Sequence, residues 1–171
     1  KRLERGKPEF ANLLNNVAIL AMLMKREDRV EQMLKQSAEI YKSTMTERSP
    51  AYAKVISDLG NFYRYKGRYA EAEPLLQQAV NIRLETLGDV HPLYVQSQED
   101  LAIFYWRKKD MERAYASYKE VMEKSLDFVN RYFPPMSEAE KTRYWDLLSP
   151  RFERFYNFAI ESAATNKDIV N

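Results

Sequence analysis

Apolar residues recur along the chain at spacings of three and four, and the same arrangement returns every 42 residues. Four prolines mark the step, at positions 8, 50, 92 and 134. Large apolar side chains keep the step over three copies, as Val17, Leu59 and Leu101 and again as Leu20, Phe62 and Phe104. Small side chains keep it separately, as Ala18, Gly60 and Ala102. A fixed period of this length predicts a stack of similar units.

Each unit is predicted to contain two helices. In the second unit the apolar pattern begins at Pro50, which suits a first helical turn because its missing N–H is not needed there. Ser49 is a candidate N-cap for this helix. Gly67 can adopt the left-handed conformation that ends the helix, and a second helix is expected from Tyr69 to about Leu87.

The other two units vary this plan. In the third, Asp110 is positioned to cap the second helix. In the first, Lys25 replaces the turn glycine. Small residues such as Gly60 and Ala72 are expected where the two helices of a unit cross, because they let the backbones approach within about 8–10 Å.

The C-terminal segment, residues 133–165, departs from the repeat, since Arg143 stands where a leucine is due. Ser137 and Glu140 have the spacing of a capping box. Ser149-Pro150 is expected to kink or restart the following helix. The segment is rich in aromatic residues, so we predict capping helices that cover the last unit. Docking of a following domain and self-association into a homodimer are the alternatives.

Composition limits the chemistry. The 171 residues include 27 basic and 25 acidic side chains, one histidine and no cysteine. This charge balance gives no support for a nucleic-acid or membrane partner. There is no glycine-rich phosphate loop, nucleophile elbow or metal-binding helix motif. We therefore predict a protein that is not an enzyme and uses no cofactor or metal.

The second unit carries a recognisable set of residues: Leu59, Gly60, Tyr63, Gly67, Tyr69, Ala72, Leu76 and Ala79. This set resembles the tetratricopeptide repeat (TPR), whose usual period is about 34 residues. The longer period resembles the variety found in kinesin light chains and many bacterial proteins. The resemblance implies an all-α fold, a right-handed superhelical array of helix-turn-helix repeats. We place three repeats at about 8–49, 50–91 and 92–132, followed by the capping segment.

The C-terminal segment is similar to the one that joins TPR arrays to a caspase-like CHAT protease domain in some bacterial proteins. That resemblance implies that the chain is a piece of a longer protein, with the protease C-terminal to it. None of the protease's catalytic residues maps onto this sequence.

In such an array the first helix of each unit lines an inner wall. The side chains on these helices that the apolar pattern does not use are candidates for partner binding. They are Asn12, Asn15, Lys54, Ser57, Asn61, Arg64, Tyr65, Gln96, Glu99, Ile103, Trp106 and Arg107. This mixture of amides, charges and aromatic rings suits a peptide. The sequence therefore predicts a scaffold that binds a peptide or partner domain, with a regulatory arm of a larger enzyme as the alternative. Ordinary solvated positions are the competing interpretation for each residue taken singly.

Overall fold

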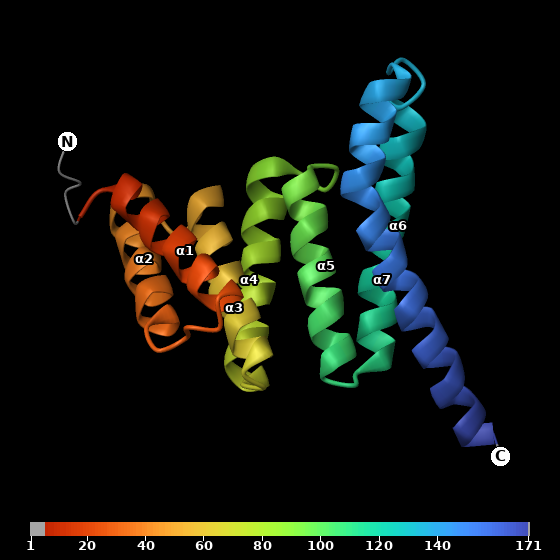
Figure 1. Cartoon of the computed structure of the whole chain (residues 1–171), viewed down its shortest axis with the longest axis horizontal. Helices are drawn as coiled ribbons and strands as arrows, with labels where there is room; N and C mark the ends of the chain where they lie inside the picture. Colours follow the sequence, from red (N-terminus) through yellow and green to blue (C-terminus); the bar gives the residue numbers. More distant parts are fainter. Residues whose placement is uncertain (1–5, 171) are drawn as a thin grey trace. The chain divides into compact units, whose positions relative to one another are not determined.

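The computed structural model describes residues 6–170, with side chains described for residues 6–164. These residues form helices and connecting turns without a strand (Figure 1). The helices are α1 (Pro8–Leu23), α2 (Val30–Met45), α3 (Pro50–Tyr65), α4 (Tyr69–Leu87), α5 (Pro92–Arg107), α6 (Met111–Tyr132) and α7 (Glu138–Val170). The predicted all-α class is confirmed.

The helix ends follow the local sequence signals. Ser49 Oγ accepts the Tyr52 backbone N–H at 3.1 Å, and Asp110 Oδ1 accepts the Arg113 backbone N–H at 3.1 Å. Each cap satisfies a backbone donor that the first helical turn would otherwise leave without a partner. Both predicted caps are confirmed.

The turns between paired helices use one conformation at three equivalent positions. Lys25, Gly67 and Lys109 all have positive φ, at 57°, 72° and 67°. Only glycine enters this left-handed region without steric cost. The two lysines therefore adopt it against their preference, because the helix that follows can pack only if the chain reverses here.

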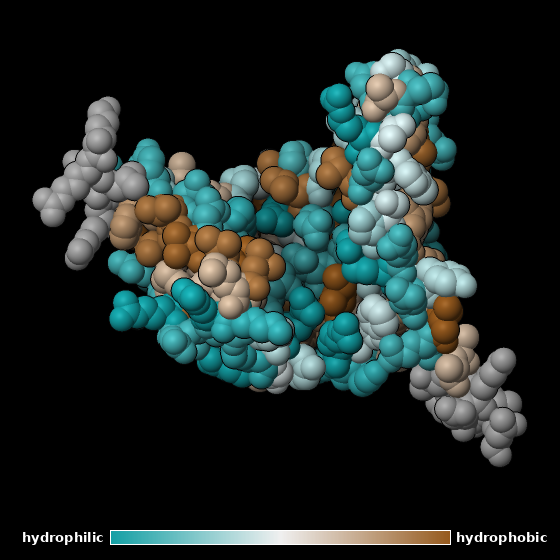
Figure 2. Space-filling view, in the orientation of Figure 1, coloured by the Kyte–Doolittle hydropathy of each residue, from teal (hydrophilic) through white to brown (hydrophobic). Residues whose placement is uncertain are grey.

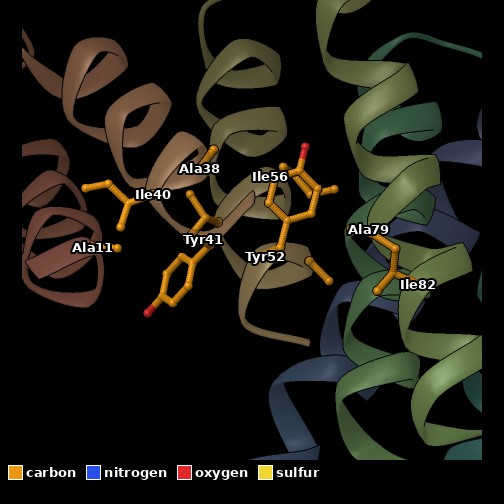
Figure 3. Packing of buried hydrophobic residues seen from close by; sticks show 10 residues of the cluster. Ala11, Ala38, Ile40, Tyr41, Tyr52, Ile56, Ala79 and Ile82 are labelled. Carbon is orange, nitrogen blue, oxygen red and sulfur yellow. The ribbon is translucent and has the colours of Figure 1, made fainter. Parts of the chain in front are cut away.

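The chain divides into two compact units, residues 1–100 and 101–171, and the division falls within α5. In the first unit α2 packs against both α1 and α3, and α3 packs against α4. The core between them includes Ala38 and Tyr41 of α2, Tyr52 and Ile56 of α3, and Ala79 of α4 (Figure 3).

Close approach of α3 and α4 depends on Gly60. A Cβ atom at this position would lie 2.9 Å from Leu76 Cγ and 3.4 Å from the Ala72 carbonyl oxygen. Ala72 is itself fully buried. The predicted role of small residues at this crossing is thus visible in the structure.

In the second unit α7 packs along α6. Its capping box is formed: the Ser137 backbone N–H donates to Glu140 Oε2 at 2.9 Å, and the Glu140 backbone N–H donates to Ser137 Oγ at 3.4 Å. Further along, the Phe158 ring lies 4.9 Å from that of Tyr118. The expected restart at Ser149-Pro150 does not occur, since a single helix continues through Pro150. Proline removes one backbone donor, but α7 packs on α6 on both sides of Pro150: the Tyr144 ring lies 5.7 Å from that of Phe128, and the Phe155 ring lies 5.8 Å from that of Tyr118.

Candidate functional site: a polar cavity in the first unit

A cavity of about 550 Å³ opens in the first unit. Its walls come from α3, from the N-terminal part of α5 and from one side chain of α4. The lining residues are Pro50, Ala51, Lys54, Ser57, Asp58, Asn61, Arg83, Leu93, Gln96 and Asp100. Most are polar or charged, and Pro50, Ala51 and Leu93 supply apolar surface. The surface that these residues expose combines apolar area with convergent polar groups, which is typical of a ligand site in which the polar groups fix the orientation of the ligand.

Asp100 is the hub of the hydrogen bonds in this cavity. Ser57 Oγ donates to Asp100 Oδ2 at 2.9 Å, and Gln96 Nε2 donates to Oδ1 at 3.4 Å. Burial raises the pKa of Asp100, while hydrogen bonds from Ser57, Asn61 and Gln96 act in the opposite direction. The carboxylate therefore orients three neutral side chains around itself.

The same connection occurs one repeat earlier. Asn15 Nδ2 donates to Asp58 Oδ2 at 2.8 Å, and Lys54 Nζ donates to the same oxygen at 3.1 Å. Asn15 and Asp58 precede Ser57 and Asp100 by 42 positions each. Successive first helices, α1 to α3 and α3 to α5, are thus joined by equivalent polar contacts.

Arg83 is a buried cation at the base of the cavity. Its side chain is only 4% exposed, and it donates from Nη1 to the Leu93 carbonyl at 3.0 Å and to Ser97 Oγ. Burial lowers its pKa, and the charges of Asp100 and Asp58 counteract this effect. Its Nε–H is buried without a hydrogen-bond acceptor among the residues that the structure describes.

The structure brings together four of the residues predicted to bind a partner. Lys54, Ser57, Asn61 and Gln96 all line the cavity. Arg64 adjoins them, since its Nε donates to Asn61 Oδ1 at 3.2 Å. Asn12 and Tyr65 are exposed but outside the lining, and the Tyr65 ring lies 5.6 Å from the Lys66 ammonium group.

Several predicted residues are buried, which corrects the premise that packing does not use them. Asn15 is 1% exposed, Ser57 is 3% exposed and Glu99 is fully buried. The apolar pattern missed this burial because a short polar side chain can be enclosed when it bonds to the neighbouring helix. For Asn15 and Ser57 those bonds are the contacts with Asp58 and Asp100.

The remaining predicted residues, Ile103, Trp106 and Arg107, belong to the second unit and do not line this cavity. Ile103 is half-buried and Arg107 is exposed. Trp106 is 9% exposed, so the premise that packing does not use it is corrected as well. Its ring lies 5.7 Å from that of Phe158, and its Nε1–H donates to Glu161 Oε2 at 2.9 Å. Trp106 thus anchors α7 within the second unit.

Sequence reasoning missed three charged residues of the cavity: Asp58, Arg83 and Asp100. One signal for the carboxylates was available, because Asp58 and Asp100 lie 42 residues apart on equivalent first helices. Arg83 gave no such signal, since it looks like an ordinary cation on the second helix until folding places it beneath Leu93 and Ser97.

The described side chains contain no group of three or more His, Asp or Glu residues arranged to hold a metal ion. None of the helices in the described part of the chain combines the length and apolar character needed to cross a bilayer.

A family model, "Tetratricopeptide repeat", matches residues 9–83 and 51–125. The chain belongs to the tetratricopeptide repeat family. No curated protein matches the sequence. The TPR assignment agrees with the paired helices, the close Gly60–Ala72 approach and the repeated turn conformation described above.

Solved structures support the same fold. BtubC (BKLC) from P. vanneervenii has a TM-score of 0.68 at 15% identity, and the match covers 94% of this TPR chain and 63% of that one. A putative kinesin light chain with nearly identical TPR-like repeats, from Podosopora anserina, has a TM-score of 0.64 at 20% identity, covering 92% and 77%. The chain thus spans less than two thirds of the BtubC structure.

Proposed function

We propose that this TPR chain is a non-enzymatic scaffold that binds an extended polypeptide in the cavity between α3 and α5. TPR repeats are protein-interaction modules, which sets the class of partner. The observation that carries the proposal is the cavity, because it is preformed and combines apolar surface with polar side chains from two successive first helices. Its volume lies within the usual range for ligand sites, roughly 300–1,000 Å³.

The amide side chains suit a peptide backbone. Asn61 accepts from Arg64 and donates to Asp100, which fixes the orientation of its side-chain amide. An amide has two N–H donors and two acceptor lone pairs, so Asn61 keeps one of each for a ligand. A peptide group presents the complementary acceptor and donor. Because the orientation is fixed in advance, binding costs less side-chain entropy.

The cavity also has a defined electrostatic character. Lys54 is paired with Asp58, and Arg83 is compensated through space by Asp100 and Asp58. The two carboxylates and two cations of the lining thus balance. A cavity without excess charge favours neutral backbone groups over a strongly charged ligand. Leu93, Pro50 and Ala51 add apolar contact for a small or medium side chain of the peptide.

A selection experiment tests this proposal. A phage-displayed library of random 12-residue peptides is panned against the chain, and the selected peptides are titrated against two paired variants. Asn61→Ala with Gln96→Ala removes the cavity amides. Gln77→Ala with Asn81→Ala removes two exposed amides of α4 that are hydrogen-bonded to each other at 3.1 Å, and serves as the matched control. We expect at least tenfold weaker binding to the cavity variant and unchanged binding to the control. Equal affinities for both variants, or no selected peptide, would contradict the proposal.

A second candidate function rests on α7. Trp145, Tyr156 and Ile160 are spaced to share one face of this helix, and all three are about half exposed or more. We propose that this face docks an adjacent domain of the same polypeptide, so that the chain acts as a regulatory arm of a larger enzyme such as a CHAT protease. The gene sequence beyond Asn171 tests this. A CHAT-type coding region supports it, and a stop codon directly after Asn171 contradicts it.

Self-association is the other use of the α7 face. Phe155 and Phe158 are unsuitable probes, because Phe158 is 1% exposed and both rings pack against Tyr118 of α6. Tyr156→Asp with Ile160→Asp alters the exposed face instead. Light scattering that gives a monomer mass for both the unmodified chain and this variant would contradict a homodimer through α7.

A further inference from the structure

Helix α1 carries an apolar stripe that no other described element covers. Its large side chains are between 42% and 77% exposed: Leu13, Val17, Leu20 and Leu23, with Met24 just beyond the helix end. Figure 2 shows the stripe as a brown band along the position of α1 in Figure 1. Contiguous apolar surface of this kind marks an interaction site more often than it marks ordinary surface.

The next repeat carries apolar residues at the equivalent positions, and there they are covered. The positions on α3 equivalent to Leu13, Val17 and Leu20 are Val55, Leu59 and Phe62, each 42 residues later. These three side chains are between 1% and 5% exposed. The same helix face is therefore buried in the second repeat and open in the first.

The cover over that face of α3 is α2. Gly60 faces Leu76 of α4, and at 3.6 residues per turn Val55, Leu59 and Phe62 lie well around the helix from Gly60. Helix α2 packs against α3. The Tyr63 hydroxyl donates to Glu31 Oε1 of α2 at 3.0 Å, which joins the two helices near Phe62. By contrast, α1 is covered by α2 only on its opposite face, where Ser37 Oγ donates to the Ala11 carbonyl at 2.7 Å.

The charges near the stripe indicate independently which kind of helix could cover it. Arg68 pairs with Glu31 in the first turn of α2, with Nη1 2.7 Å from Oε2. The residue equivalent to Arg68 in the first repeat is Arg26, 42 positions earlier. Arg26 is exposed and forms no ion pair with any residue that the structure describes. Arg26 thus lies at the end of the stripe, in the position from which Arg68, between α3 and α4, binds the second helix of the preceding repeat.

We infer that the α1 stripe docks the second helix of a further TPR hairpin, one that carries a carboxylate in its first turn to pair with Arg26. The required chemistry is that of a second helix of the repeat, with an apolar contact face and a carboxylate in its first turn, as in α2 with Ala38, Ile40 and Tyr41 (Figure 3). Helix α4 carries Val80, Ile82 and Arg83 at the positions equivalent to these three residues, and Glu73 at the position equivalent to Glu31. This surface is separate from the peptide cavity and does not depend on the function proposed for it.

The test adds such a hairpin to the full chain. A second copy of residues 50–91 is inserted between Lys7 and Pro8, so that its α4 sequence falls in the register that covers α1. Amide hydrogen exchange is then followed for α1, whose sequence is not duplicated. We expect the inserted segment to become helical. The α1 amides should exchange at least about tenfold more slowly, because burial of the stripe stabilises α1. Leu20→Asp should abolish this slowing, while Leu84→Asp on the original α4, also at an exposed leucine, should leave it intact.

A separate pair of variants tests the predicted ion pair of Arg26. Arg26→Ala in the extended chain should reverse part of the slowing, while Arg29→Ala, a change of an exposed arginine nearby, should not. An inserted hairpin that stays unfolded, or one that folds without slowing exchange in α1, overturns the inference. A dimer of the original chain that Leu20→Asp converts to a monomer also overturns it, because the stripe would then bind a second copy.

Discussion

Ser57 donates its hydroxyl hydrogen to Asp100 at 2.9 Å, and Asn15 makes the equivalent contact with Asp58 at 2.8 Å one repeat earlier. Each pair joins the first helices of two successive repeats. Both donors are almost completely buried. The polar contacts thus fix the spacing of the helices that form the cavity walls, in addition to satisfying buried groups.

Removing the Ser57 hydroxyl should destabilise the chain. Hydrogen bonds to charged groups contribute about 1.5–3 kcal/mol, so we expect Ser57→Ala to lower the free energy of unfolding by about 1–2 kcal/mol, measured by urea denaturation. Ser43→Ala is the control, because the Ser43 hydroxyl bonds only within its own helix, to the Ile40 carbonyl at 3.0 Å. In an Asp100→Asn background the Ser57→Ala cost should shrink. An equal cost in both backgrounds would show that the two residues are not coupled.

Gly60→Ala should also destabilise the chain. The added methyl group would lie 2.9 Å from Leu76 Cγ and 3.0 Å from Leu76 Cδ2, so α3 and α4 must separate or Leu76 must shift. Overpacking of this kind costs roughly 1–3 kcal/mol, partly offset by the higher helix propensity of alanine. In a Leu76→Ala background the same change should instead stabilise the chain, because the clashing atoms are gone. Thermal unfolding of the four proteins decides between additive and coupled effects, and strict additivity would refute the contact.

Lys25→Gly should stabilise the protein. Lys25 adopts φ of 57°, the conformation that Gly67 provides without strain at the equivalent turn. The left-handed conformation costs a non-glycine residue about 1 kcal/mol, so we expect a gain of about 0.5–1 kcal/mol in the free energy of unfolding. Gly67→Lys should lose a similar amount. A lower unfolding midpoint for Lys25→Gly would contradict the assignment of strain at this turn.

Glu31 should make stability depend on pH in the acidic range. Hydrogen bonds from Arg68 and Lys35, with a further one from Tyr63, lower the pKa of Glu31 from 4.5 to about 2. The folded pKa is below the unfolded one, so the stabilisation is complete above about pH 5 and is lost as pH falls from 4.5 towards 2. Because the ion pairs are partly exposed, we expect a contribution of roughly 1–2 kcal/mol at pH 7.

Urea unfolding of the unmodified chain and of Glu31→Gln measures this effect. Their difference in unfolding free energy should fall by more than half between pH 7 and pH 3. Glu39→Gln on the same helix, where the side chain is exposed, should show little difference at either pH. A Glu31→Gln difference that stays constant from pH 7 to pH 3 would contradict the lowered pKa.

The sequence predicted the helices well and the cavity only in part. Local signals, such as the Ser49 cap and the left-handed Gly67, depend on a few adjacent residues and were read correctly. The burial of Asn15 and Trp106 depends on residues far away in the chain, namely Asp58 and Phe158. A helical pattern shows which positions are apolar, but it does not show which polar side chains a neighbouring helix will enclose.

The central claim is that a polypeptide binds between α3 and α5. The most direct measurement is an NMR titration of the ¹⁵N-labelled chain with a selected peptide, following the side-chain NH₂ signals. We predict that the Asn61 and Gln96 signals shift in proportion to the bound fraction, while those of Gln77 and Asn81 stay fixed. Shifts confined to Gln77, Asn81 or residues of the second unit, with Asn61 and Gln96 unchanged, would contradict the account.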